Sequence, residues 1–255
     1  MSFIFKNALV RKPSESISRA ISSRGIAPNY LKVCEEHKKY VEALNSCGLE
    51  VNILGSLEDF PDSIFIEDPA LIYNHVCIIL KPGTHSRFGE SKALEKDITN
   101  RFNEVLFIDN GNIEGGDVLR IKDHFIIGLS ERTNETGAKE LSEKLNFLGA
   151  SSEISNTPQG VLHFKSDCSL VDEETILVTK KMKNTRIFSK SYRIIEVPDG
   201  EELAANTIRV NDSLLIPSGF KKTEDLLSKY YNLKIMKVTE ISKVDAGLSC
   251  MSLRW

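Results

Sequence analysis

Five residues with chemically useful side chains recur at a nearly regular spacing along the sequence. They are Asp68, Glu114, His163, Asn206 and Cys250, and neighbouring members are 43 to 49 residues apart. A cysteine can act as a nucleophile, a histidine can transfer its protons, and carboxylates can hold a cationic group. Singly, a cysteine or a histidine is more often a buried structural residue. The common spacing instead predicts that all five meet at one place.

Cys250 and His163 are the expected nucleophile and acid/base partner. Cys250 lies in DAGLSCMSL, where Gly247 allows a sharp turn or a close approach of the backbone to a ligand. His163 lies in GVLHFKS, at the expected start of a strand. The other cysteines, at 34, 47, 77 and 168, are expected to be structural. No cysteine or histidine pair has the spacing of a metal site, so we expect neither a metal nor a cofactor.

Carboxylates cluster in two short segments. Glu114 and Asp117 flank two glycines, which let the backbone bend so that both acids face one point. Asp62, Glu67 and Asp68 surround the apolar run of FPDSIFIEDP. If that run is a strand, Glu67 and Asp68 point to opposite faces. A poorly solvated carboxylate requires a cation, either an internal arginine or lysine or the guanidinium of a substrate.

Arg87 and Arg132 occupy matched positions, each in the loop after the second strand of its segment. Matched arginines suggest a clamp for a substrate carboxylate, because guanidinium binds carboxylate with two hydrogen bonds. Ordinary surface salt bridges are an equally good interpretation of these two residues.

The elements that must position these residues repeat with a period of about 45 residues. The order strand, strand, helix, strand appears four times from Ser63 onward, and the two termini supply a split fifth copy. Helices are expected at 30–46, 91–102, 135–148 and 223–231, with a weaker helical pattern in the third complete copy. We therefore predict an α/β fold, a five-fold pseudosymmetric propeller closed by pairing of the terminal strands, rather than an α+β domain without symmetry. Residues 1–255 are expected to form a single catalytic domain.

Bulk composition favours an ordinary globular protein. Hydrophobic residues make up 41% and charged residues 27% of the 255, and the net charge is −3. These values give no indication of a nucleic-acid or membrane partner. The five cysteines have no disulfide pattern, and neither a signal peptide nor a membrane span is recognisable. A cytoplasmic location is the resulting expectation.

Seven ordered segments resemble the dimethylarginine dimethylaminohydrolase family, within the guanidino-modifying enzymes of the pentein fold. They are FPDSIFIEDP, PGTHSRFGE, EGGDVL, IGLSERTNETGA, VLHFKS, LAANTIRVND and GLSCMSLRW. The resemblance implies a ring of five ββαβ units and hydrolysis of methylated arginines to citrulline and an amine, through a covalent intermediate on the cysteine.

The same resemblance implies a role for individual residues. Cys250 is the implied nucleophile, His163 the acid/base and Glu114 its charged partner. The implied substrate contacts are Asp68 at the guanidinium, Arg87 and Arg132 at the α-carboxylate, Ile21 in a lid formed by Pro13 to Pro28, and Asp62, Glu67, Asp117 and Val244 in support. The implied partner is a small guanidino amino acid, and a homodimer is compatible with the family.

Lys165 separates this sequence from two related groups. Arginine and agmatine deiminases typically carry an aspartate two residues after the catalytic histidine, where this chain has Lys165. Two alternatives stay open at this point: a deiminase-like hydrolase of another guanidino substrate, and a binding protein on the same fold without catalytic activity.

Overall fold

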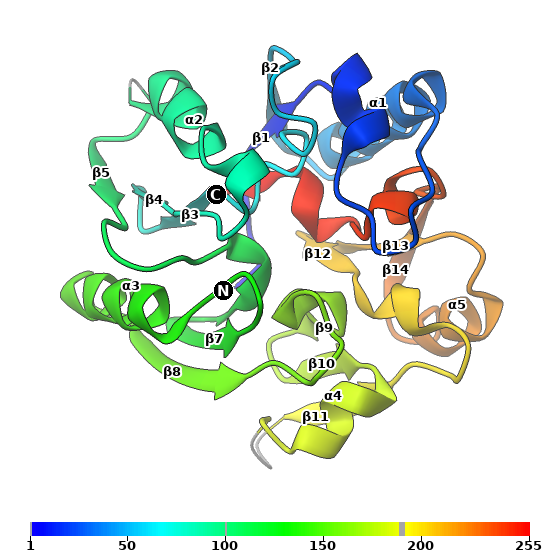
Figure 1. Ribbon diagram of the computed structural model, residues 1–255. Helices are drawn as coiled ribbons and strands as arrows, with labels where there is room; N and C mark the ends of the chain where they lie inside the picture. The colour runs from blue at the N-terminus through cyan, green and yellow to red at the C-terminus, as the bar shows by residue number, and fades with distance from the viewer. Residues whose placement is uncertain (1, 100, 189–191) are drawn as a thin grey trace.

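The computed structural model describes residues 2–99, 101–188 and 192–255, and in them five small sheets surround a central axis (Figure 1). Each sheet has three strands in the same order. The first strand is antiparallel to the second, and the third is parallel to the second. A helix links the second and third strands of each unit. The structure thus confirms the five-fold α/β propeller of ββαβ units.

The elements have the following bounds. The sheets are β15 (Leu253–Arg254), β1 (Asn7–Arg11) and β2 (Glu50–Leu54); β3 (Ala70–Tyr73), β4 (Val76–Ile79) and β5 (Glu104–Phe107); β6 (Val118–Ile121), β7 (His124–Leu129) and β8 (Ser151–Asn156); β9 (Cys168–Asp172), β10 (Thr175–Val178) and β11 (Arg193–Glu196); β12 (Ile208–Val210), β13 (Ser213–Pro217) and β14 (Asn232–Met236). The helices are α1 (Tyr30–Ser46), α2 (Glu90–Ile98), α3 (Glu135–Phe147), α4 (Lys180–Thr185) and α5 (Lys221–Leu227). None of the helices in these ranges is long and apolar enough to cross a membrane.

Side-chain caps start the helices that the sequence predicts best. The side chain of Asn29 accepts a hydrogen bond from Lys32 N at the start of α1, and Asn134 does the same for Gly137 N at the start of α3. Helices α2 and α5 end before their predicted limits. The apolar residues Phe102 and Tyr231 extended the predicted helical stripe, but they pack against the core from the turns that follow.

The inner strands are shorter than predicted, and the polar residues precede them. Strand β3 begins only at Ala70, and the segment before it forms consecutive turns. The expectation that Glu67 and Asp68 lie in a strand and point to opposite faces is therefore wrong. The three apolar residues Ile64, Phe65 and Ile66 gave the segment a strand-like appearance, yet the turn buries all three together.

The termini meet as predicted. Strand β15 pairs antiparallel with β1, with Ala8 opposite Arg254 and Leu9 opposite Leu253. This pairing completes the fifth sheet but leaves five separate sheets, so the outer strands β2, β5, β8, β11 and β14 remain edges. Packing between neighbouring inner strands, rather than a continuous hydrogen-bonded ladder, holds the ring together.

Tyr40 joins α1 to the C-terminal segment that carries Cys250. It is fully buried, and its hydroxyl donates to Leu248 O over 2.9 Å and lies 2.7 Å from Ser252 Oγ. We expect Tyr40→Phe to lower the free energy of unfolding by about 1–3 kcal/mol, because Leu248 O loses its side-chain donor and Ser252 Oγ keeps only its bond to Arg254 Nη1. Urea denaturation measures this loss. Tyr230→Phe, at a tyrosine that is 57% exposed, is the matched control, and an equal loss there would contradict the argument.

Candidate active site

A small cavity opens at the end of the ring where the inner strands begin. Turns from all parts of the chain border it, which places sequence-distant side chains together as the spacing predicted. Its lining residues are Ile21, Asp62, Phe65, Asp68, Arg87, Arg132, Leu162, His163, Val244, Asp245, Ala246 and Cys250.

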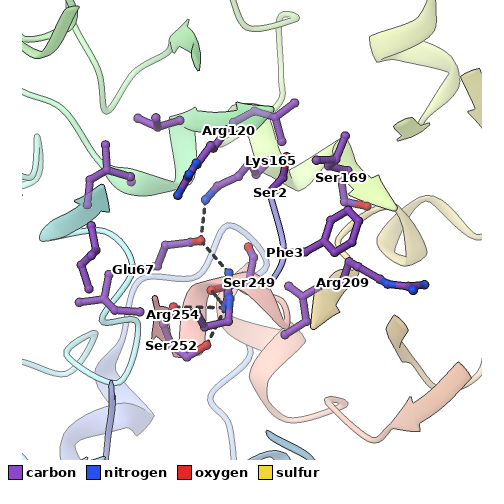
Figure 2. Close-up of a pocket in the computed structure, with 18 of the residues that line it drawn as sticks. Ser2, Phe3, Glu67, Arg120, Lys165, Ser169, Arg209, Ser249, Ser252 and Arg254 are labelled. Atoms are coloured by element: carbon purple, nitrogen blue, oxygen red, sulfur yellow. Dashed lines mark hydrogen bonds and ion pairs between the residues drawn. The ribbon is translucent and has the colours of Figure 1, made fainter. Parts of the chain in front are cut away.

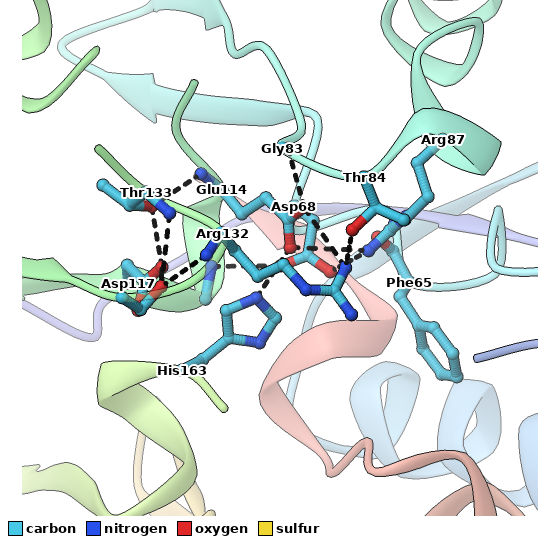
Figure 3. Close-up of polar contacts among 12 residues, drawn as sticks. Phe65, Asp68, Gly83, Thr84, Arg87, Glu114, Asp117, Arg132, Thr133 and His163 are labelled. Atoms are coloured by element: carbon cyan, nitrogen blue, oxygen red, sulfur yellow. Dashed lines mark hydrogen bonds and ion pairs between the residues drawn. The ribbon is translucent and has the colours of Figure 1, made fainter. Parts of the chain in front are cut away.

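His163 is held by two carboxylates. Its Nε2 lies 2.7 Å from Glu114 Oε2, and Glu114 is fully buried (Figure 3). Asp117 holds the histidine from the backbone side, because its Oδ1 accepts a hydrogen bond from Phe164 N over 2.8 Å. The other Asp117 oxygen accepts from the hydroxyls of Ser130 and Thr133. The position of the imidazole is thus fixed from two sides.

The two glycines between these acids cannot be replaced by larger residues, because neighbouring atoms lie too close to allow a Cβ. A Cβ on Gly115 would lie 2.0 Å from Glu67 O, and one on Gly116 would lie 2.8 Å from the His163 ring. Neither glycine has a positive φ. The prediction that this tetrapeptide bends to serve one site is correct, but the reason is space for the histidine rather than backbone freedom.

The carboxylates also determine the charge of His163. Burial alone would lower its pKa, but Asp68, the hydrogen bond to Glu114 and Asp117 outweigh burial and raise the pKa to about 9. His163 is therefore a cation at neutral pH, and its Nε2 donates to Glu114. A histidine in this state can protonate a leaving group.

The surroundings of Cys250, in contrast, favour the neutral form of its side chain. It lies in a short 3-10 turn, Ser249–Met251, is 9% exposed, and its Sγ accepts a hydrogen bond from Gly247 N over 3.5 Å. Burial, and then the nearby negative charges of Asp68 and Glu67, raise the pKa of this thiol to about 12. In the empty site Cys250 is therefore a neutral thiol.

Asp68 and Arg87 form a buried ion pair at the centre of the site. Arg87 Nη1 lies 2.6 Å from Asp68 Oδ2, and two further nitrogens of the same guanidinium donate to both oxygens of Glu90. Gly116 N donates to Asp68 Oδ1 over 3.1 Å. Burial opposes the charge of Asp68, yet Arg87 and His163 outweigh it and lower the pKa of this carboxyl. Asp68 is therefore an anion with a fixed orientation.

Arg87 and Arg132 differ in how many donors they have left. Arg87 is 3% exposed and gives most of its N–H groups to Asp68, Glu90 and Phe65 O, which leaves one hydrogen on Nη1. Arg132 borders the cavity with a half-buried side chain that contacts Thr84 Oγ1 through Nη1. Both guanidinium groups lie near Glu114, whose carboxylate oxygens are 3.8 Å from Arg87 Nη1 and 3.6 Å from Arg132 Nη1 (Figure 3).

The segment Pro13 to Pro28 closes over the cavity. Ile21 N donates to Asp62 Oδ1 over 3.2 Å, and the Ser23 hydroxyl donates to Asp245 Oδ1 over 2.8 Å. Asp245 has φ of +57°, a conformation that a residue other than glycine adopts at a cost. Burial raises the pKa of Asp62. The cavity is therefore bordered by a lid whose middle part, at Ile21 and Ser23, is hydrogen bonded to two aspartates.

The structure brings most of the predicted site residues to the cavity, but not all. Cys250, His163, Asp62, Asp68, Arg87, Arg132, Ile21 and Val244 line it. Glu114 and Asp117 lie behind the histidine, and Glu67 faces a different cavity. Glu67 and Asp117, whose implied role was to support the substrate contacts, do not line the active-site cavity.

Sequence reasoning missed Glu90, Asp245 and the role of Asn206. Asn206 holds the turn of the nucleophile, because its side chain accepts from Ser249 N over 3.0 Å and donates to Ser249 Oγ over 3.1 Å. The spacing of three residues between Arg87 and Glu90, at the start of a helix, was the one available signal for that pair. Asp245 carried no comparable signal.

Three ligand-type atoms, from Asp68, Glu114 and His163, lie within 4.8 Å of one another, the one such group in the described ranges. A cation already neutralises each carboxylate, since Arg87 pairs with Asp68 and His163 with Glu114. The donors are thus committed to charged side chains, and this set fits a metal poorly.

The raised pKa of the Cys250 thiol predicts how its rate of alkylation depends on pH. In the substrate-free protein, its alkylation by iodoacetamide should accelerate about tenfold per pH unit between about pH 7 and pH 10, because the thiolate is the reactive form and the thiol pKa is about 12. Peptide mapping by mass spectrometry gives the rate. Asp68→Asn should increase it at fixed pH, whereas Asp167→Asn, near Cys168, should not. A plateau below pH 9 would contradict the raised pKa.

Comparison with known proteins identifies the family. The family model described as N,N dimethylarginine dimethylhydrolase, eukaryotic, matches residues 9–253. The N(G),N(G)-dimethylarginine dimethylaminohydrolase of Pseudomonas aeruginosa is 34% identical, over 99% of this chain and 100% of that protein. A structure of the P. aeruginosa enzyme, a cysteine-to-serine variant complexed with citrulline, has a TM-score of 0.96, 33% identity and coverage of 99% and 100%. A dimethylarginine dimethylaminohydrolase carrying a histidine-to-glycine substitution, an adduct with S-methyl-L-thiocitrulline, has a TM-score of 0.95 at 33% identity over 98% of this chain and 100% of that one. This chain belongs to the dimethylarginine dimethylaminohydrolase family.

Proposed function

We propose that this protein hydrolyses Nω-methylated arginines to citrulline and dimethylamine or methylamine, with Cys250 as the covalent nucleophile. The observation that carries the proposal is that one cavity is bordered by a thiol, a cationic histidine and an anionic aspartate. Family membership supports the same reaction, because relatives have been solved with citrulline and with a thiocitrulline adduct.

The polar groups of the cavity suit the two ends of the substrate. Asp68, with Asp62 in support, holds the guanidinium. Arg132 binds the α-carboxylate, and the remaining Nη1 hydrogen of Arg87 gives one further bond. Ile21 and Val244 cover the aliphatic part of the substrate from the lid side.

Substrate binding itself activates the thiol. Asp68, which together with burial raises the pKa of Cys250, is neutralised when a guanidinium cation binds between this carboxylate and the sulfur. The thiol proton then leaves to solvent, and the resulting thiolate lies beside the electrophilic carbon. Activation is thus coupled to recognition of a cation.

Two proton transfers by His163 complete the reaction. The thiolate attacks the guanidinium carbon, and cationic His163 protonates the departing amine nitrogen, because an amide anion cannot leave. A thiouronium intermediate on Cys250 remains, and His163 is neutral. Water then attacks the same carbon while His163 takes a proton from it, the carbon–sulfur bond breaks, and citrulline leaves with the cysteine restored.

The whole chain acts as one catalytic domain in this proposal, since the cavity takes residues from near both termini. The five cysteines are free, which is compatible with the predicted cytoplasmic location. That location and a homodimer stay predictions. Light scattering on a size-exclusion column tests the second of them.

Turnover by a substrate panel tests the reaction. Asymmetric dimethylarginine and monomethylarginine should release citrulline at rates unchanged by a chelator, and Cys250→Ser should abolish this release because a hydroxyl is a much weaker nucleophile. Quenched reactions should carry the adduct on the Cys250 peptide, and Cys34→Ser should behave like wild type. Faster turnover of unmethylated arginine would instead support a deiminase-like hydrolase, and no turnover of any panel member would support a binding protein.

Ligand affinity separates the two arginines. In a Cys250→Ser background, Arg132→Ala should weaken binding of citrulline by about 1.5–3 kcal/mol, the value of a hydrogen bond to a charged group. Agmatine, which has no carboxylate, should lose little. Arg87→Ala should weaken both ligands, because Asp68 loses its buried partner. Calorimetry with both ligands measures the pattern. A loss confined to citrulline in Arg87→Ala would assign that arginine to the carboxylate clamp alone.

A further inference from the structure

A second cavity lies along the ring axis, beyond the candidate active site (Figure 2). The inner strands begin beside the active site and run away from it, and this cavity is lined mostly by those strands rather than by the turns that precede them. It shares no lining residue with the active-site cavity and has a volume of about 150 Å³. It is therefore a separate compartment.

Cationic side chains dominate the lining of this axial cavity. They are Arg120, Lys165, Arg209 and Arg254, against the single carboxylate of Glu67. In its own sheet, each of the three arginines pairs with the second residue of the adjacent middle strand. The three arginines therefore occupy equivalent places in their units. Three of the five inner strands thus carry an arginine at the same place beside the cavity, which favours an anionic ligand.

Glu67 introduces one acceptor among these donors. It is 6% exposed, its Oε1 accepts from Lys165 Nζ over 2.5 Å, and Arg254 Nη2 lies 3.6 Å away. Its Oε2 is buried and has no hydrogen-bond partner in the described part of the protein. A buried carboxylate oxygen without a donor is rare and requires an explanation. The Glu67 carboxylate therefore keeps an unused capacity to accept a hydrogen bond.

The cations around Glu67 keep donors available. Lys165 makes one hydrogen bond to a carboxylate, so two ammonium hydrogens remain. Arg120 donates to Lys122 O only through Nε, and its guanidinium lies 4.9 Å above the Tyr73 ring. In Figure 2, Lys165 and Arg254 point toward Glu67 and Arg120 is directed to the same side, while Arg209 extends away.

We propose that the axial cavity binds monohydrogen phosphate. The phosphate oxygens accept from Arg120, Lys165 and Arg254, and the remaining P–OH donates to Glu67 Oε2. This assignment pairs every group described above, because monohydrogen phosphate is an anion that still carries one donor at neutral pH. Sulfate has the same shape and charge but no proton, so its oxygen would face the carboxylate of Glu67 without a hydrogen between them.

Isothermal titration calorimetry of the intact protein at about pH 7.5 and matched ionic strength tests this site, with phosphate and sulfate as the two probes. Wild type should bind phosphate at least about tenfold more tightly than sulfate, because a hydrogen bond to a charged group distinguishes them. Glu67→Gln should remove most of this difference, since its amide group can donate to an oxygen of either anion. The wild-type comparison requires no variant and is thus independent of any effect of Glu67→Gln on folding.

Variants that each remove one arginine test where the phosphate binds. Arg120→Leu should weaken phosphate at least about tenfold, and Arg209→Leu, which removes the same charge from a side chain that extends away, should have a much smaller effect. Arg132→Ala removes a cation from the active-site cavity and should leave phosphate affinity unchanged. Absence of phosphate binding, equal affinity for the two anions, or a loss in Arg132→Ala as large as in Arg120→Leu would overturn the proposal.

Discussion

The buried ion pair between Asp68 and Arg87 is the interaction on which the site depends. Removing two charges from water costs several kcal/mol for each ion, and only close pairing and full hydrogen bonding recover that cost. Arg87 satisfies this condition by bonding to Asp68, Glu90 and the Phe65 carbonyl at once. The aspartate is thereby held as an anion, with its remaining capacity directed into the cavity.

The same network leaves the site two cations short. Five buried carboxylates, Asp62, Asp68, Glu90, Glu114 and Asp117, surround a cavity with three cationic side chains, Arg87, Arg132 and His163. The surplus of negative charge raises the pKa of the Cys250 thiol and of the His163 imidazole together. An incoming guanidinium adds one positive charge next to Asp68, so the Cys250 thiol ionises more readily once the substrate is bound. Recognition and activation thus have one electrostatic cause.

The repeat made the architecture and the convergence of the site predictable. Equivalent turns of a ring face the same end of its axis, so the spacing of Asp68, His163 and Cys250 was enough to place them together. The sequence could not distinguish a residue that borders the cavity from one that lies behind it. Glu67 and Asp117 carry a carboxylate like that of Asp68, and only packing directs them elsewhere. Glu90 and Asn206 act through other side chains, and nothing in a residue type reveals such a partner before the fold is known.

The net charge of the chain does not show how its charged side chains are distributed along the ring axis. The formal value of −3 suggests no anionic ligand, yet the ring axis carries a surplus of carboxylates at one end and of arginines and lysine at the other. The Glu67–Lys165 pair lies between the two ends: Glu67 N donates to Cys250 O, and Lys165 O accepts from the Asn206 side chain that holds the cysteine turn. A guanidinium is attracted to the first end and repelled by the second, so cations reach the nucleophile from the lid side. The segregation follows from the fold, because turns and inner strands alternate along the chain but lie at different levels of one axis.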